Sequence, residues 1–157
     1  MMGDIFSKEK RSDIMSRIRS KDTIPEQSLL TAIRQTVGKR WRIDRNVQSL
    51  PGRPDVVLPS LHLVIFLDGC FYHCCPLHGH SPKSNRRYWV PKLQRNKQRD
   101  CLNRRILRSM GYLVVRFWEH ELRPSRSRMT EAKLKRVITR AKAVQQDKRL
   151  RCSQRGV

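Results

Sequence analysis

Apolar residues three or four positions apart predict amphipathic helices in several parts of the chain. The clearest stripe follows Thr23-x-x-Glu26, a spacing typical of a helix N-terminus with Pro25 in its first turn, and it stops at Gly38. Its members are Leu29, Leu30, Ile33 and Val37. We therefore expect a helix between Thr23 and Gly38 with one face against the core.

Three further segments show the same period. Residues 8–20 form a basic segment with Ile14, Met15 and Ile18 on one side. A second helix is expected over residues 88–110, and Gly111 stops it. The side chains expected to point inward are Leu93, Leu102, Ile106 and Leu107. A last helix is expected from Thr130 as N-cap, with the stripe Leu134, Val137, Ile138, Ala141 and Val144. Periodicity is lost from Gln145, so residues 146–157 are predicted to be a basic, disordered tail.

The strands are predicted from alternation and from short apolar runs. Trp41, Ile43 and Val47 alternate with polar residues, and residues 55–58 follow the turn LPGRP. Residues 61–67 and 112–118 are nearly continuous apolar runs, as expected for strands that are buried on both faces. The order is ααβββαβα, which predicts an α/β fold: a small mixed sheet flanked by helices, in one domain over residues 1–145.

Charge is the strongest compositional signal. The 157 residues include 35 Lys and Arg against 13 Asp and Glu, a net charge of +22. Such an excess opposes compaction unless a polyanion neutralises it, so nucleic acid is the expected partner. There is no apolar run of membrane-spanning length and no secretory signal at the N-terminus, and we expect no membrane association. Five cysteines then indicate metal ligation in a reducing cytoplasm.

One short stretch, DGCFYHCCPLHGH (residues 68–80), concentrates the metal-binding residue types. Cys70, Cys75 and His78 offer two thiolates and an imidazole, and structural zinc requires four such ligands in a tetrahedron. The fourth ligand that we favour is His120, because it follows residues 112–118, and strands that pair side by side would bring the end of that segment close to Cys70. The alternatives are His80, Cys74, Cys101 and Cys152.

Two acids flank the central apolar runs. If residues 55–58 and 61–67 pair as a hairpin, Asp55 and Asp68 reach the same edge of the sheet, where carboxylates can bind Mg²⁺. The alternative for each is a local turn or cap. His73, whose ordinary pKa lies near neutrality, is the candidate for proton transfer, and its alternative is a plain surface residue or zinc-site neighbour.

Four segments together resemble one family. LPGRPDVVL, VIFLDGCFYHCCPLHGH, RYWVPKLQRNKQRD and GYLVVRFWEHEL resemble, in the same order, the very-short-patch mismatch repair (Vsr) DNA endonucleases. The resemblance spans about residues 8–122. It implies a restriction-endonuclease-like core with a structural zinc site, although Cys70 stands where the usual lysine of that core would follow the second acid.

The resemblance also implies roles for individual residues. Asp55 corresponds to the principal Mg²⁺ ligand, and the Leu67 backbone carbonyl to a second one. His73 corresponds to the general acid or base, and Glu26 to an acid that reaches the metal through water. Asp68 is grouped with the catalytic residues, although some relatives carry histidine there. The implied structural zinc ligands are Cys70, Cys75, His78 and His120.

The resemblance explains the two aromatic residues between the metal ligands. Phe71 and Tyr72, with Met15 from the N-terminal helix, correspond to a wedge inserted beside a T·G mismatch. The second aromatic of the family is usually tryptophan, and core packing is the alternative for all three. The basic residues expected to contact DNA phosphates are Arg17, Arg19, Lys92, Arg95 and Lys97, the first two on a DNA-contacting arm, residues 8–20.

The expected function is therefore a Mg²⁺-dependent endonuclease that recognises a T·G mispair in double-stranded DNA and hydrolyses the phosphodiester 5′ to the mismatched T. We expect it to act as a monomer in the bacterial cytoplasm, on the nucleoid, with mismatch-repair accessory proteins. Two alternatives stay open: a nuclease of the same fold without mismatch dependence, and a zinc-stapled DNA-binding module without activity.

Overall fold

The two apolar runs in the middle of the chain pair as the predicted hairpin. Strands β2 (Val56–Leu58) and β3 (Leu63–Asp68) are antiparallel, with Val57 opposite Val64, and η1 (Pro59–Leu61) forms the turn between them. The structure is a computed structural model that describes Ser7, Lys10, Asp13 and residues 23–154, without the side chains of Arg149, Cys152 and Gln154. The arm predicted over residues 8–20, with Met15, Arg17 and Arg19, lies outside these residues apart from Lys10 and Asp13.

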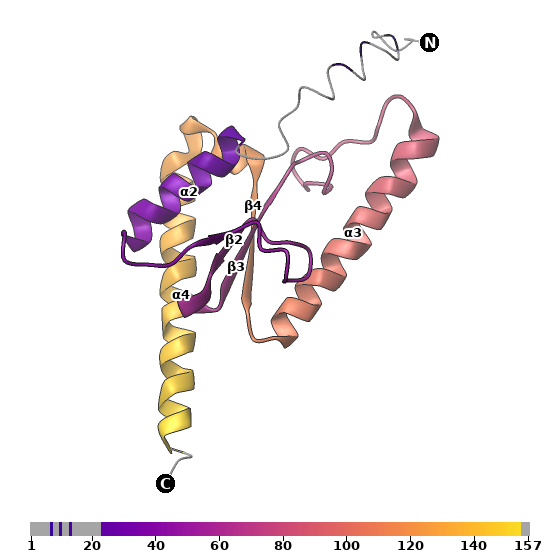
Figure 1. The fold of residues 1–157 in the computed structure, drawn as a ribbon. Helices are drawn as coiled ribbons and strands as arrows, with labels where there is room; N and C mark the ends of the chain where they lie inside the picture. Colours follow the sequence, from indigo (N-terminus) through magenta and orange to yellow (C-terminus); the bar gives the residue numbers. More distant parts are fainter. Residues whose placement is uncertain (1–6, 8–9, 11–12, 14–22, 155–157) are drawn as a thin grey trace.

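Two further strands complete a four-stranded mixed sheet in the order β1-β2-β3-β4 (Figure 1). The edge strand β1 comprises only Asp44–Arg45, shorter than the strand predicted from Trp41 to Val47. Strand β4 (Leu113–Trp118) runs parallel to β3, with Asp68 opposite Trp118. The expected mixed sheet flanked by helices is confirmed.

Alternate residues of the central strands face two different layers. One layer contains α2 (Ile24–Val37) and α4 (Ser127–Gln154), and it buries Ile65 and Phe117 of the sheet against Leu29, Ile33 and Leu134 of the helices. On the opposite face, Val57 and Val64 pack with Leu107 of α3 (Arg86–Ser109). Figure 1 shows α3 on one side of the sheet and α2 and α4 on the other.

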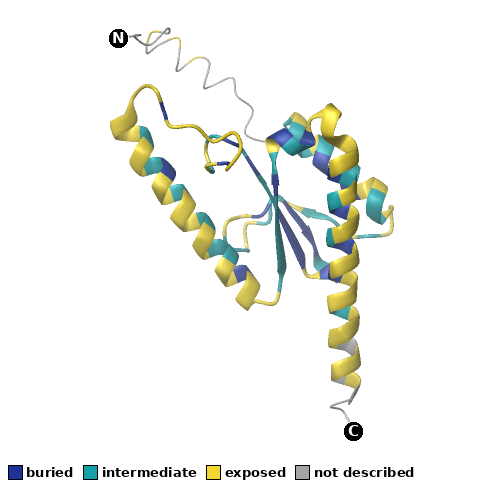
Figure 2. Ribbon diagram, turned by 180° about the vertical axis from the view of Figure 1, so that it is seen from behind, coloured by how far each residue is buried: buried dark blue, intermediate teal, exposed yellow. Residues whose placement is uncertain are grey.

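The inward face of α3 differs from the one that we expected. Leu93 and Leu107 are buried, but Leu102 and Ile106 are 57% and 38% exposed. The stripe that faces the sheet instead runs through Asn96, Asp100, Asn103 and Arg104, all half-buried, between the two buried leucines. The spacing of three and four residues is helical, but the middle of the stripe is polar, so hydrophobicity alone selects the wrong face. The middle of α3 therefore presents polar side chains to the sheet, and Figure 2 shows that this helix is exposed along most of its length.

Both ends of α4 also differ from the prediction. The helix begins at Ser127, and Thr130 is buried inside it, where its hydroxyl donates to the Glu121 carbonyl at 2.5 Å. It continues to Gln154, so residues 146–154 are helical instead of a disordered tail. No Gly or Pro interrupts this segment, and an ion pair joins Asp147 to Arg151 four residues later. No helix among the described residues is long and apolar enough to span a membrane.

The two ends of α4 should contribute very differently to stability. Leu134→Ala removes a fully buried side chain from the core and should lower the free energy of unfolding by about 2–5 kcal/mol. Leu150→Ala, on the exposed end of the same helix, should change it by less than about 0.5 kcal/mol. Chemical denaturation of both variants tests this difference. Equal losses would contradict the assignment of the core.

Candidate active site and metal centre

The hairpin brings Asp55 to the end of β3. Asp55 directly precedes β2, and its Oδ2 accepts a hydrogen bond of 2.7 Å from the Leu67 backbone N–H. Asp68, the next residue after Leu67, ends β3. The prediction that Asp55 and Asp68 share one edge of the sheet is therefore matched by the geometry.

A pocket of about 610 Å³ opens at this edge. Its acids are Asp55, Asp68 and Asp100, and His73 also lines it. Four arginines come from the turn before Asp55, from α3 and from β4. They are Arg53, Arg99, Arg104 and Arg116. A pocket lined by both carboxylates and arginines can bind a divalent cation together with a phosphate.

Asp55 is a partly buried carboxylate whose ionised form is disfavoured. Burial raises its pKa to about 6, and the nearby charges of Asp68 and Glu26 act in the same direction, whereas the Leu67 N–H lowers the pKa. A carboxylate that ionises at such cost is stabilised by any cation that reaches it. The donors at this site are the Asp55 carboxylate and a backbone carbonyl at the end of β3. Such oxygen ligands fit a hard divalent ion such as Mg²⁺.

Glu26 lies behind Asp55 and not in the main pocket. Its backbone N–H donates the expected capping hydrogen bond to the Thr23 hydroxyl oxygen at 3.4 Å, and the Thr23 hydroxyl in turn donates to Glu26 Oε1 at 3.1 Å. Glu26 and Asp55 both line a separate cavity of about 10 Å³. That volume corresponds to about one water molecule. Contact between Glu26 and a metal at Asp55 would therefore have to pass through water.

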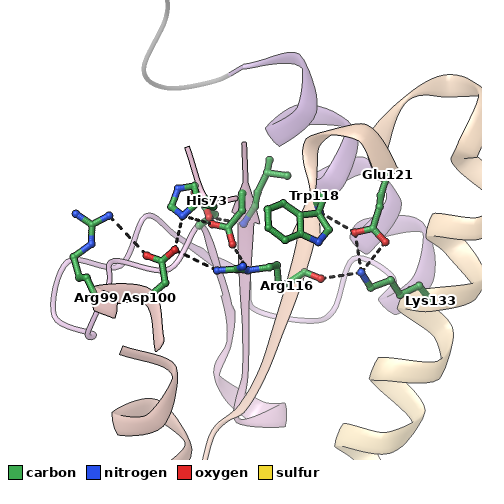
Figure 3. A network of polar contacts seen from close by, with 10 residues as sticks. His73, Arg99, Asp100, Arg116, Trp118, Glu121 and Lys133 are labelled. Carbon is green, nitrogen blue, oxygen red and sulfur yellow. Dashed lines mark hydrogen bonds and ion pairs between the residues drawn. The ribbon is translucent and has the colours of Figure 1, made fainter. Parts of the chain in front are cut away.

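His73 belongs to a network of charged side chains (Figure 3). Its Nδ1 lies 2.5 Å from Asp100 Oδ2 and 3.5 Å from Asp68 Oδ1. Arg116 forms ion pairs with both acids, through Nε to Asp68 and through Nη2 to Asp100 at 3.3 Å. Because Asp68 is engaged by Arg116, it is less available to a metal than Asp55.

Asp100 and Arg116 are site residues that the sequence reasoning missed. Two signals could have revealed them. Arg116 is the only charged residue in the apolar strand LVVRFW, and Asp100 lies seven residues from both Leu93 and Leu107 on the buried stripe of α3. A charge on an otherwise buried face requires a partner.

The predicted zinc ligands converge in a second cluster. The ligand atoms of Cys70, Cys75, His78 and His120 all lie within 4.8 Å of one another. His120 Nδ1 is 3.1 Å from Cys70 Sγ and 3.7 Å from Cys75 Sγ, and Cys75 Sγ is 4.0 Å from His78 Nδ1. A tetrahedral zinc site places such S and N atoms about 3.5 Å apart. The four residues therefore fit a tetrahedral Zn²⁺ ion.

Local backbone geometry holds this cluster together. The parallel pairing of β3 with β4 places the residues after Asp68 beside η2 (Glu119–Leu122), which carries His120. Cys70 N–H donates to Glu119 Oε1 at 3.0 Å, and Gly79 N–H donates to the Cys75 carbonyl at 2.7 Å. A Cβ on Gly79 would lie 2.9 Å from the Cys75 nitrogen, so the tight loop requires glycine here.

Three alternative ligands lie outside the cluster. Cys74 and Cys101 are exposed free thiols, and the ring of His80 packs against Phe71 with centroids 5.2 Å apart. The side chain of Cys152 is not described by the structure.

Burial raises the pKa of the Cys70 thiol to about 11 and lowers the pKa of His120, so a bound metal must displace a proton from Cys70.

The aromatic pair lies beside this loop on the surface. Tyr72 is 41% exposed and Phe71 is half-buried, and both contact Trp89 of α3, with ring centroids 6.0 Å and 5.2 Å away. Asn96 donates to the Tyr72 carbonyl at 3.1 Å. The aromatic pair therefore packs against α3 and is not part of either buried core cluster.

The basic residues predicted on α3 lie near this aromatic surface. Lys92 Nζ donates to the Tyr88 hydroxyl at 2.8 Å and lies over the Trp89 ring. Arg95 and Lys97 are exposed on the same helix. Arg53 and Arg104, which the sequence reasoning did not select, line the pocket itself.

Comparison with known proteins agrees with this geometry. Residues 3–81 match the family described as DNA mismatch endonuclease Vsr. The chain is also 33% identical, over 138 residues, to the DNA mismatch endonuclease Vsr of Escherichia coli strain K12, a match covering 85% of this chain and 83% of the relative. This chain belongs to the Vsr family. It is a DNA endonuclease of a divalent-metal-dependent class.

Other relatives in this family are described as nicking enzymes. The type II nicking enzyme V.XorIIP of Xanthomonas oryzae pv. oryzae is 38% identical over 139 residues, which cover 87% of this chain and 98% of the relative. V.NmeAIP of Neisseria meningitidis is 40% identical over 124 residues, which cover 78% of this chain and 86% of the relative. The restriction-endonuclease-like fold that we expected is thus supported by the family as well as by the sheet.

Cys75→Ala should remove bound zinc and lower the melting temperature, because three ligands seldom retain a structural ion. The adjacent Cys74→Ala is a matched control, since Cys74 is exposed and outside the cluster. Elemental analysis of the purified variants, with thermal unfolding, tests the assignment. Unchanged zinc content in Cys75→Ala would remove Cys75 from the ligand set.

Asp55→Asn should stabilise the magnesium-free protein at neutral pH. Because burial raises the folded-state pKa of Asp55 to about 6 from an ordinary value of 3.8, the native protein loses stability as the pH rises between about 4 and 6. The asparagine removes this cost, worth about 1–3 kcal/mol, and can still accept from the Leu67 N–H. Chemical denaturation at pH 4 and pH 7.5 in magnesium-free buffer should show a gain only at the higher pH, and an equal effect at both would contradict the assignment.

Proposed function

We propose that this protein nicks one strand of double-stranded DNA at a T·G mismatch, hydrolysing the phosphodiester 5′ to the mismatched T to start very-short-patch repair. The observation that carries the proposal is the presence of Asp55 and His73 in the lining of one pocket, where the half-buried Phe71 and the exposed Tyr72 directly precede His73 in the chain. Nicking is also the activity named for several relatives. A binding module without activity has no use for a partly buried acid in the same pocket as a histidine.

In this proposal Asp55 and the Leu67 backbone carbonyl hold Mg²⁺. When bound, the ion supplies positive charge to the scissile phosphate and lowers the pKa of attacking water. The raised pKa of Asp55 favours binding of a cation, and Glu26 would contact the ion through a water in the cavity behind Asp55. Asp68 has a supporting role in the same network, because its charge is engaged by Arg116.

His73 would transfer the proton at the scissile phosphate. Its Nδ1 is occupied by Asp100, which leaves Nε2 as the nitrogen for the substrate. An acid that holds one imidazole nitrogen fixes both the tautomer and the orientation of the ring. This arrangement suits general acid or base catalysis by His73.

Phe71, Tyr72 and Met15 would insert beside the mismatch. A mismatched step is already poorly stacked, so an apolar wedge costs less there than in paired DNA, and this difference supplies selectivity. Phe71 and Tyr72 project from a loop that Cys70, Cys75, His78 and His120 would clamp through zinc, and that loop is braced by Trp89. A rigid wedge avoids the entropic cost of ordering the loop on binding.

The basic residues would bind the DNA backbone on both sides of the wedge. We assign phosphate contacts to Lys92, Arg95 and Lys97 of α3, to Arg17 and Arg19 of the N-terminal arm, and to Arg53 and Arg104 in the pocket. Such contacts predict an affinity that falls steeply with salt. We place the protein in the bacterial cytoplasm on the nucleoid, as a monomer that works with mismatch-repair accessory proteins.

A plasmid that contains one T·G pair tests the proposal directly. With Mg²⁺, we expect a single-strand nick 5′ to the mismatched T, and no nick in the fully paired plasmid. Nicking of both plasmids would instead mean a nuclease without mismatch dependence, which the smaller Tyr72 ring at the wedge makes the main rival. Retention of the plasmid without nicking would mean a binding module.

Asp55→Ala should abolish nicking and leave DNA affinity within about threefold, because Asp55 contacts the metal and not the bases. Nicking in Mg²⁺ and gel-shift binding in Ca²⁺ measure the two properties separately. A matched control is Asp147→Ala, which removes an acid from the exposed end of α4 and should leave nicking unchanged. Undiminished nicking in Asp55→Ala would place the metal elsewhere.

A further inference from the structure

Arg116 is a cation in a strand that is otherwise apolar. Its side chain is 22% exposed, and it lies beneath the Trp118 ring, with the guanidinium carbon 4.7 Å from the ring centroid. Partial burial of a guanidinium costs free energy unless hydrogen-bonded acids compensate for it. The fold therefore retains Arg116 at a cost in free energy that its contacts have to offset.

Arg116 closes a ring of four side chains that come from four different segments. Asp68 ends β3, His73 lies in the cysteine-rich loop, Asp100 is in the middle of α3, and Arg116 is in β4. His73 contacts both acids, at 2.5 Å and 3.5 Å, and Arg116 contacts the same two acids from the other side. Figure 3 shows His73, Asp100 and Arg116 joined in this way.

The two acids are held by different nitrogens of one rigid group. Nε of Arg116 faces Asp68, and Nη2 lies 3.3 Å from Asp100 Oδ2, the same oxygen that faces His73 Nδ1. Because the guanidinium is planar, its nitrogens fix the separation and orientation of the acids that they bind. A lysine ammonium would supply the charge without this geometry.

We propose that Arg116 is a positioning residue for the nicking reaction: by fixing Asp68 and Asp100, it fixes the ring of His73 relative to the scissile phosphate. This inference rests on the proposed role of His73 in proton transfer. In this role Arg116 would act through the acids and not through the DNA backbone, because its Nε and Nη2 face Asp68 and Asp100. Arg53 and Arg104 line the same pocket and form no ion pair among the described residues, so they are the cations of the pocket that remain for phosphate.

The test compares three variants of the full-length, zinc-loaded protein. Arg116→Met removes the charge and the fork, Arg116→Lys keeps only the charge, and Arg151→Gln removes an exposed arginine that also pairs with an aspartate, Asp147. Single-turnover nicking of the T·G plasmid at saturating enzyme and Mg²⁺ gives the rate, and binding in Ca²⁺ gives the affinity. Thermal unfolding confirms that each variant is folded.

We expect nicking to slow by about 10–100-fold in both Arg116 variants, as for other residues that orient a catalytic group, with DNA affinity within about threefold. Arg151→Gln should nick within about twofold of the parent. A native rate in Arg116→Lys would overturn the proposal, since the charge alone would then suffice. A loss of affinity without a loss of saturated rate would make Arg116 a DNA-binding residue and would also overturn it.

A second readout does not depend on nicking. In ¹⁵N-labelled protein, the ring nitrogens of His73 report whether Nδ1 carries the proton that is donated to Asp100, and Asp100→Asn provides the reference for loss of that bond. The Arg116→Met spectrum should move from the parent signature toward that reference at constant pH. An unchanged spectrum would refute the positioning role, even if the parent itself failed to nick and the proposed function were wrong.

Discussion

The pairing of β3 with a strand on each side is the constraint on which the site depends. Its antiparallel register with β2 brings Asp55 against the Leu67 N–H, and its parallel register with β4 brings Trp118 beside Asp68 and His120 near Cys70. A shift of one residue would send each of these side chains to the opposite face of the sheet. The acid site and the cysteine–histidine cluster are therefore positioned by the same hydrogen-bonded ladder.

The apolar side chains of β3 keep that register fixed. Leu63 and Ile65 face one helical layer while Val64 faces the other, so slippage would expose buried surface on both sides at once. Stability from the core thus supports a site whose own groups are costly, since Asp55 and Arg116 are both partly buried charges.

The sequence was sufficient for features that follow from local pattern. The hairpin around Pro59 and the helix capped by Thr23 need only periodicity and turn chemistry, and the choice of His120 needs one parallel strand pair. The face of α3 was predicted wrongly because Leu102 and Ile106 are apolar and yet exposed. Asp100 and Arg116 were missed for a related reason: their partners lie on other segments, and no local spacing records an ion pair between a helix and a strand.

His73, Phe71 and Tyr72 stand between Cys70 and Cys75 in the chain. A zinc ion bound by these two cysteines would therefore also restrain the loop that carries the imidazole and the aromatic pair. A strong chelator that removed a metal from Cys70 and Cys75 would disorganise the imidazole and the aromatic pair in one event.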